Sequence, residues 1–194
     1  MRQGIDSSCK DWNAKSCLDY SAVYDAQAKL LVVQYCQGAA ETQCTNMQIT
    51  SSDMGKTWSK IQTSMAAVLG HANGVLVGPG RGLQLKSPKY HQGRLLFCGH
   101  KEDTISGRIS PIWTSDDHAL TFKLRSVFPR GSPTPFDKYG PDECQFAELE
   151  DGTVIYNARN NWLGHGQLEH YRLQSRSTDG GDRCCLSLLL SLLL

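Results

Sequence analysis

The chain has 194 residues, enough for one domain with a substantial hydrophobic core. Its 20 lysine and arginine residues balance 19 aspartate and glutamate residues, which gives a formal net charge of +1. This balance, without runs of like charge, excludes a nucleic-acid-binding surface that depends on excess basic charge.

The two ends of the sequence differ from the rest. Residues 1–17 carry none of the motifs described below, and the start lacks the apolar stretch of a secretory signal peptide. Residues 186–194 are rich in leucine, and we interpret them as foreign to the fold, the product of a frameshift, a mis-spliced end or a truncated gene model. No apolar stretch reaches the roughly 20 residues that a transmembrane helix needs, so no membrane span is expected.

Short strand-like segments separated by turns dominate the sequence. Predicted strands are Lys29–Tyr35, Met47–Thr50, Arg94–Cys98, Phe146–Leu149 and Thr153–Asn157. Turn signals such as Gln92-Gly93 and Asp151-Gly152 lie between them, and no long stretch has a helical period. The sequence therefore predicts an all-β sandwich, barrel or propeller.

An internal repeat selects the propeller among these. The pattern Ser-x-Asp-x-Gly-x-x-aromatic starts at Ser51, recurs sixty-four residues later and again after a further sixty-two. Its members are Ser51, Asp53, Gly55 and Trp58, then Ser115, Asp117 and Phe122, then Ser177, Asp179 and Gly181. Ala119 replaces the glycine of the second copy, and Cys184 replaces the aromatic residue of the third.

Each residue type in this pattern has a structural use. Serine and aspartate side chains bond backbone groups within a turn, glycine permits positive φ, and a buried aromatic ring anchors the turn. We interpret the pattern as a structural staple without chemistry. We expect its three copies to occupy equivalent hairpin turns of successive four-stranded sheets.

The eight cysteines and six histidines show no metal-ligand spacing, so we expect neither a metal site nor a cofactor. Cys36 and Cys44 bracket a loop between two strand-like segments. They form a disulfide if the compartment is oxidising, and otherwise they are free or buried thiols.

Four motifs between the repeats are more specific: Gly78–Gln84, Gly93–His100, Pro141–Gln145 and Asp151–Asn160. With the repeats, which resemble Asp boxes, they resemble the exo-α-sialidase (neuraminidase) family. The Cys-Gly-His, Pro-Asp-Glu-Cys-Gln and Asn-Ala-Arg-Asn forms are most similar to animal lysosomal sialidases. The resemblance covers the domain 18–185 and implies a six-bladed β-propeller, of which about three blades are present.

The resemblance also implies an activity. Family members release terminal sialic acid from glycoproteins, oligosaccharides or gangliosides, with a tyrosine nucleophile and retention of configuration. A carboxylate activates that tyrosine, a separate aspartate is the acid/base, and three arginines bind the substrate carboxylate, for which the planar guanidinium is suited. The implied partner is thus a sialylated glycoconjugate, while protein partners stay unknown. The implied location is the lysosome or the secretory pathway, membrane-associated, with the cytoplasm left open.

Two residues match the family pattern. Glu143 matches the carboxylate that activates the tyrosine, and Arg159 matches the second substrate-binding arginine. Arg81 is a further candidate near the pocket floor, with a plain tight loop as the alternative, since Gly-Pro-Gly-Arg-Gly lacks the Lys-Ser/Thr of a P-loop. The other site residues fall before or after the matched region, so we expect this chain alone to be inactive. The rival interpretation is a non-catalytic Asp-box propeller that only binds.

Local geometry tests the pairing of Glu143 with Arg159. Gly152 suits the left-handed position of a three-residue hairpin loop, 150–152. In that register Glu143 opposes Arg159, and both side chains leave one face at the same end of the hairpin. A two-residue turn would put Arg159 on the other face, so the hypothesis requires the first register or a bulge with the same effect.

Overall fold

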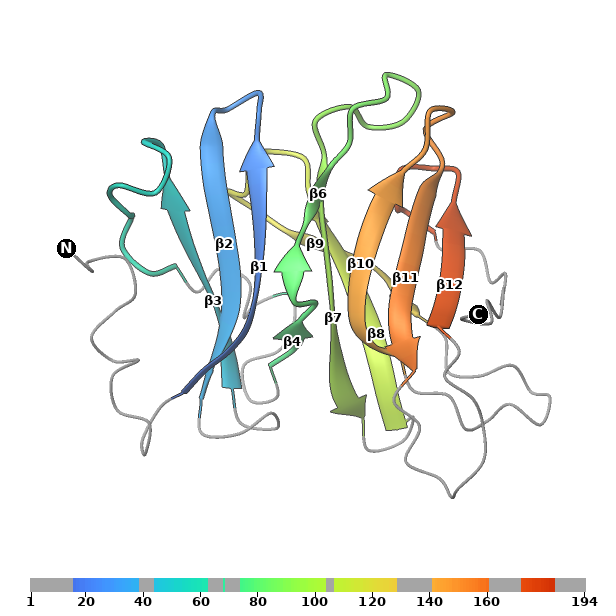
Figure 1. Cartoon of the computed structure of the whole chain (residues 1–194), viewed down its shortest axis with the longest axis horizontal. Helices are drawn as coiled ribbons and strands as arrows, with labels where there is room; N and C mark the ends of the chain where they lie inside the picture. Colours follow the sequence, from blue (N-terminus) through green and yellow to red (C-terminus); the bar gives the residue numbers. More distant parts are fainter. Residues whose placement is uncertain are drawn as a thin grey trace.

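The computed structural model describes residues 16–38, 44–62, 68, 74–103, 107–128, 141–160 and 172–183, and its strands form three sheets (Figure 1). The strands are β1 (Ser16–Asp25), β2 (Leu30–Gly38), β3 (Cys44–Ser51), β4 (Leu76–Val77), β5 (Gly80–Arg81), β6 (Leu83–Gln84), β7 (Leu95–Asp103), β8 (Gly107–Ser115), β9 (Lys123–Phe128), β10 (Pro141–Glu148), β11 (Val154–Asn160) and β12 (Arg172–Ser177). All five strands predicted from the sequence overlap β2, β3, β7, β10 and β11, so the all-β prediction is confirmed.

We call the sheets I (β3-β2-β1-β5), II (β4-β7-β8-β9, with β6 also on β7) and III (β10-β11-β12). Within each sheet the long strands are antiparallel meanders, and the one parallel pair among the described strands is β1 with β5. Figure 1 shows the three sheets side by side in chain order, from blue to red. This arrangement resembles successive propeller blades.

The sheets do not have a uniform four strands: sheet III has three among the described residues, and the strand beside β7 in sheet II is interrupted. β4 pairs with the middle of β7 and β6 with its start, while β5 between them pairs with β1 of sheet I. Pro79 lacks an amide donor, and Gly80 has φ +104°. A Cβ on Gly78 would lie 2.3 Å from the Cys144 carbonyl oxygen, so sheet III also approaches here. The Gly-Pro-Gly segment is therefore a junction of all three sheets.

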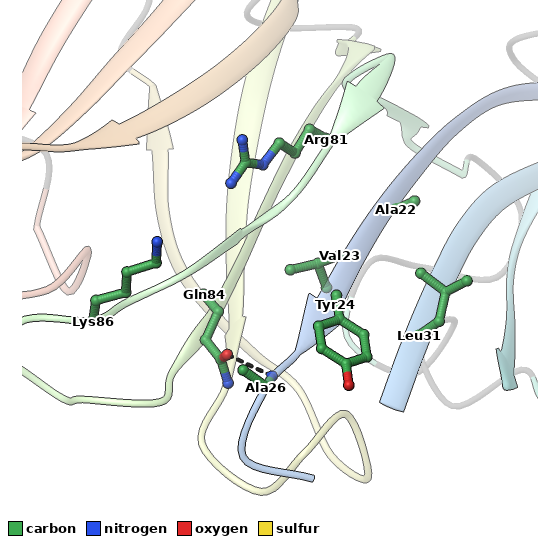
Figure 2. Close-up of a pocket in the computed structure, with 8 residues that line it drawn as sticks. All are labelled: Ala22, Val23, Tyr24, Ala26, Leu31, Arg81, Gln84 and Lys86. Atoms are coloured by element: carbon green, nitrogen blue, oxygen red, sulfur yellow. Dashed lines mark hydrogen bonds between the residues drawn. The ribbon is translucent and has the colours of Figure 1, made fainter. Parts of the chain in front are cut away.

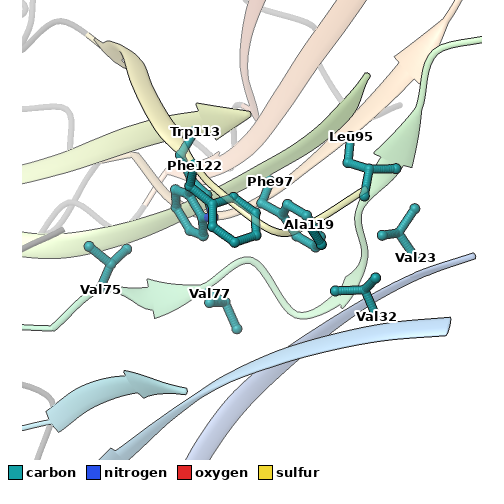
Figure 3. Close-up of a cluster of buried hydrophobic side chains, with 9 residues drawn as sticks. All are labelled: Val23, Val32, Val75, Val77, Leu95, Phe97, Trp113, Ala119 and Phe122. Atoms are coloured by element: carbon teal, nitrogen blue, oxygen red, sulfur yellow. The ribbon is translucent and has the colours of Figure 1, made fainter. Parts of the chain in front are cut away.

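Clusters of apolar side chains hold the sheets together, and two of them are the largest. The larger one lies between sheets I and II (Figure 3) and contains Val23, Val32, Val75, Val77, Leu95, Phe97, Trp113, Ala119 and Phe122. The Phe97 ring stacks on Trp113 and meets Phe122 edge-on, with centroid distances of 6.3 and 6.2 Å. The second cluster lies between sheets II and III and contains Cys98, Ile112, Cys144, Tyr156, Ala158 and Leu173. Burial of these faces provides the main contact between neighbouring sheets.

The three Asp boxes form the same turn, and each begins at the last residue of a strand, β3, β8 or β12. In the first, the Gly55 amide donates to Ser51 Oγ (2.8 Å) and the Thr57 amide to Asp53 Oδ1 (2.8 Å). The corresponding bonds of the other copies join Ala119 N to Ser115 Oγ (2.9 Å), Thr121 N to Asp117 Oδ1 (2.9 Å), Gly181 N to Ser177 Oγ (2.8 Å) and Arg183 N to Asp179 Oδ1 (3.0 Å). The expected equivalence of the three turns is confirmed.

The residue types of the Asp box act as expected from the sequence. Hydrogen bonds from Thr57 hold the pKa of Asp53 at about 2. The fifth position has positive φ in every copy: Gly55 at +86°, Ala119 at +66° and Gly181 at +89°. Trp58 lies against Gly55, and Phe122 is buried in the core, while Cys184 falls outside the described residues.

Each of the second and third turns also contacts the sheet before it. His118 Nδ1 in the second turn lies 2.7 Å from Asp25 Oδ2 at the end of β1. Beside the third turn, Arg94 of sheet II donates to Gly180 O (3.0 Å) and Asp182 Oδ1 (2.8 Å). Arg94 is only 2% exposed and pairs as well with Asp116 of its own sheet (2.6 Å). The Asp-box turns therefore join neighbouring sheets along one edge of the molecule.

Two disulfides have both of their cysteines within the described ranges. Cys36 and Cys44 are bonded, with a Cα–Cα distance of 5.5 Å, which confirms the disulfide alternative. A second disulfide joins Cys98 of β7 to Cys144 of β10 across the boundary of sheets II and III (Cα–Cα 6.2 Å). Within the described ranges no helix has the length and apolar character needed to cross a membrane. The leucine-rich tail and residues 1–15 lie outside these ranges.

Candidate functional site

The β10–β11 hairpin has the register that the pairing of Glu143 with Arg159 requires. The Leu149 amide donates to Thr153 O (2.8 Å), and the Gly152 amide donates to Leu149 O (3.0 Å), which closes a three-residue loop. Gly152 has φ +83°, as expected for its position. Cys144 pairs with Ala158, in agreement with the first of the two registers considered.

A β-bulge at the start of β10 refines this geometry. The register shifts between Pro141, which pairs with Asn160, and Cys144, which pairs with Ala158. Two residues of β10, Asp142 and Glu143, thus occupy the space opposite Arg159 on β11. A bulge of this kind bends the strand and redirects a side chain.

Glu143 and Arg159 meet as expected. Arg159 Nη1 donates to Glu143 Oε2 at 3.3 Å, and the two side chains are 44% and 51% exposed for glutamate and arginine. An exposed ion pair contributes about 0–1 kcal/mol to stability, so folding gains little from this one. The geometric prediction that both side chains converge at one end of the hairpin is confirmed, and their roles remain predictions.

The pair lies at the edge opposite to the Asp-box turns. β10 begins and β11 ends at the lower edge in Figure 1, whereas β12 ends at the upper edge and leads into an Asp box. We call the lower edge the site edge and the upper one the Asp-box edge.

Sequence reasoning missed a buried pair directly beside Glu143. His100 Nε2 on β7 lies 2.9 Å from Asp142 Oδ1, and both side chains are 4% exposed. The spacing of the histidines indicates no metal site, and so it does not point to His100. The available signal was its place in Cys-Gly-His, two residues from Cys98, which is bonded to Cys144.

A second arginine lies next to Arg159. Arg172 on β12 is the direct cross-strand partner of Arg159. Its Nε donates to Asn157 Oδ1 through a short hydrogen bond, which orients the guanidinium. The site edge of sheet III therefore combines two guanidinium groups with one carboxylate, an arrangement that suits an anionic ligand.

Arg81 is not part of this group. It lines a separate cavity of about 460 Å³ beside β1 (Figure 2), whose other lining residues are Ala22, Val23, Tyr24, Ala26, Leu31, Gln84 and Lys86. Neither Glu143 nor Arg159 lines that cavity. The structure thus brings two of the three candidates together, and the pocket-floor role of Arg81 stays a prediction.

Two further kinds of site come into question within the described part of the chain, a metal site and a reactive tyrosine. No three His, Cys, Asp or Glu side chains gather there in a way that could hold a metal ion. Tyr156 is buried, and its hydroxyl donates to Ser110 Oγ at 2.7 Å in the second core cluster. This tyrosine is part of the packing between sheets II and III.

Solved sialidase structures share this fold. The Hadza microbial sialidase Hz136 superposes with a TM-score of 0.70 at 20% identity, covering 92% of this chain and 34% of that one. The intramolecular trans-sialidase of Ruminococcus gnavus gives 0.66 at 15% identity, covering 96% and 57%. The Trypanosoma rangeli sialidase gives 0.61 at 18% identity, covering 88% and 28%. The chain thus spans between about a quarter and somewhat over half of the length of these proteins.

A protein-family model matches most of this chain. The family described as BNR repeat-like domain matches residues 10–184, which include all three Asp boxes and the β10–β11 hairpin. The chain therefore belongs to the BNR repeat-like domain family.

Proposed function

We propose that this chain carries part of the catalytic site of an exo-α-sialidase of the animal lysosomal type. In this proposal Arg159 binds the carboxylate of a terminal sialic acid, and Glu143 activates a tyrosine nucleophile. The observation that carries the proposal is the contact between these two side chains at 3.3 Å, at the exposed end of a bulged hairpin in a sialidase-like fold. The proposed substrates are sialylated glycoproteins, oligosaccharides or gangliosides.

The chemistry of the pair fits these roles. A guanidinium binds a carboxylate through two parallel hydrogen bonds, which orients the substrate as well as attracting it. A glutamate within hydrogen-bond reach of a phenol accepts its proton and raises its nucleophilicity. Arg159 also keeps Glu143 in place until substrate arrives, because the two side chains already touch.

We propose further that the complete enzyme is a six-bladed propeller. The acid/base aspartate, the nucleophilic tyrosine and two more arginines would come from parts of the protein beyond this segment. The supporting observation is that this chain spans only 34% of the Hz136 sialidase. We expect the 194-residue chain alone to leave a fluorogenic sialoside unhydrolysed.

A location in the lysosome or the secretory pathway follows as a related proposal. Its support is the pair of disulfides, since such bonds persist in oxidising compartments. Fractionation of cells that express the protein should place it with lysosomal or secretory membranes. Recovery in the cytosolic fraction would count against this proposal.

Sequencing a full-length transcript is the first test of the function. We expect an Arg-Ile-Pro segment, which would carry the first substrate-binding arginine, upstream of Ser16. We also expect a tyrosine codon in the nucleophile's place downstream of the third Asp box. A transcript without either would favour the rival binding protein, which needs the turns and not the catalytic residues.

The product of that transcript is then assayed on a fluorogenic sialoside. Glu143→Gln should lower kcat about a hundredfold and change KM little, because it removes a base and keeps the shape. Arg159→Lys should lower kcat/KM about tenfold or more, because the planar fork is lost. Arg176→Lys, at an exposed position of β12 away from the pair, is the matched control and should have no effect. Binding of sialosides without turnover would refute the enzymatic proposal.

A further inference from the structure

We infer that His100 is a positioning residue for this site: through Asp142 it holds the β10 bulge that directs Glu143 toward Arg159. The structural half of this inference stands on the geometry alone. Its catalytic consequence rests on the function proposed above.

Two cross-links join β7 of sheet II to the first residues of β10 in sheet III. One is the disulfide between Cys98 and Cys144. The other is the contact of His100 Nε2 with Asp142 Oδ1 at 2.9 Å, two residues after Cys98 on β7 and two residues before Cys144 on β10. The covalent link fixes the strand where regular pairing with β11 starts, and the histidine fixes it beyond that point, within the bulge.

The histidine determines which way Asp142 faces. The Asp142 side chain is 4% exposed, and a carboxylate is buried at such a site only where hydrogen-bond or charged partners compensate for lost water. His100, equally buried, supplies one such partner from the facing sheet. Asp142 and Glu143 are adjacent within the bulge, so fixing the Asp142 side chain on the inner face restricts the direction in which Glu143 leaves the strand. Glu143 is indeed 44% exposed and touches Arg159.

The His100 imidazole holds Asp142 through one of its two nitrogens. Nε2 carries the proton that is donated to Asp142, whereas the buried Nδ1 has no hydrogen-bond partner among the described residues. A glutamine in the same place can present its amide nitrogen where Nε2 lies and retain the donor. A leucine fills the space and provides no donor. An asparagine is polar and too short to reach.

A second histidine provides a matched control. His118 also pairs with a buried aspartate of a neighbouring sheet, Asp25, at 2.7 Å. That pair lies at the Asp-box edge, away from Glu143. Replacing it therefore perturbs the contact between sheets without touching the site edge.

The structural test uses the 194-residue chain and backbone amide hydrogen exchange followed by NMR. His100→Leu should accelerate exchange at Glu143 and Cys144 about tenfold and shift the Arg159 side-chain resonance. His100→Gln should restore both toward the wild-type values, and His118→Leu should leave both unchanged. If His100→Leu does not fold, His100→Asn takes its place with the same expectation. Unchanged exchange in the leucine or asparagine variant, or an equal change in His118→Leu, would overturn the inference.

The catalytic test uses the full-length product in the sialoside assay. His100→Leu should lower kcat about a hundredfold with little change in KM, as a misplaced catalytic group does, and His100→Gln should recover most of it. If Glu143→Gln retains full activity, the proposed function fails. The hydrogen-exchange measurement still tests whether His100 positions Glu143, because it does not depend on activity. If Glu143→Gln is impaired and His100→Leu is not, the positioning role alone fails.

Discussion

The Asp-box edge and the site edge of the three sheets are held together by different means. At the Asp-box edge one hydrogen-bonded turn occurs three times with nearly the same distances, and it needs only side chains within seven residues of one another. At the site edge the Cys98–Cys144 disulfide, the buried His100–Asp142 pair and a bulge come together at one place, the start of β10. The repeated turn thus accounts for the scaffold, and the candidate chemistry lies where these particular contacts combine.

The disulfides provide the largest test of this comparison. Replacing Cys98 and Cys144 together by alanine should cost about 4 kcal/mol of unfolding free energy in a loop-entropy account. Replacing Cys36 and Cys44 together by alanine should cost about 2.5 kcal/mol of unfolding free energy by the same relation. The difference arises because the cross-links close 46 and 8 residues of chain, respectively. Urea unfolding of the two double variants measures both losses, and equal losses would contradict the entropic explanation.

The next largest effect should come from the Asp-box edge. Arg94→Met leaves Asp116 and Asp182 without their buried cationic partner, so we expect a loss of about 3 kcal/mol. Arg125→Met removes a guanidinium that reaches the same two carboxylates from a position that is 20% exposed, and it should cost about 1 kcal/mol. The same unfolding assay compares the two variants. If Arg94→Met and Arg125→Met lose equally little unfolding free energy, the buried guanidinium of Arg94 is no more important to stability than the partly exposed one of Arg125.

Two glycines of the repeat sharpen the contrast between copies. Gly55 and Gly181 have φ of +86° and +89°, so alanine should cost each about 1 kcal/mol of backbone strain. At Gly181 the added Cβ would also lie 2.8 Å from Leu96 Cδ2, against 3.5 Å from Trp58 at Gly55. Gly181→Ala should therefore lose about 1 kcal/mol more than Gly55→Ala through overpacking. Thermal unfolding of both variants decides, and a greater loss at Gly55 would contradict the packing argument.

The smallest effect concerns pH. Asp53 has a pKa of about 2 against an ordinary 3.8, because Thr57 and Ser51 donate hydrogen bonds to its carboxylate. The folded state therefore favours the ionised form, and this contribution to stability is fully present above the ordinary pKa and disappears as the pH falls toward 2. NMR titration of the Asp53 carboxyl carbon should give the lowered value. In Asp53→Asn the loss of stability that Asp53 causes at acidic pH should be absent. If the unfolding free energy of this variant depends on acidic pH as in the wild type, Asp53 makes no such contribution.

The parts of the fold that depend on near neighbours were readable from the sequence. The Asp boxes and the β10–β11 register follow from turns in which Gly55 and Gly152 sit in the left-handed region. The Cys98–Cys144 disulfide and the His100–Asp142 pair were not readable, because they join residues on different sheets, and spacing does not reveal cysteine partners. β1, β8, β9 and β12 were missed because polar residues interrupt their apolar pattern, and packing between sheets decides such strands. β4, β5 and β6 were missed because two residues are too few to show a pattern.

The contacts of the Asp-box turns with the preceding sheet use different side chains at the two boundaries. Between sheets I and II the carboxylate, Asp25, belongs to the earlier sheet and the imidazole, His118, to the turn. Between sheets II and III the cation, Arg94, belongs to the earlier sheet and the carboxylate, Asp182, to the turn. His118 is the fourth residue of its box, and the fourth residue of the third box is Gly180. Exchanging the two turns would therefore leave the buried Asp25 carboxylate without its imidazole partner. Although the backbone of the turn repeats, the repeats are not interchangeable, because each turn carries the side chains that fit its own neighbour.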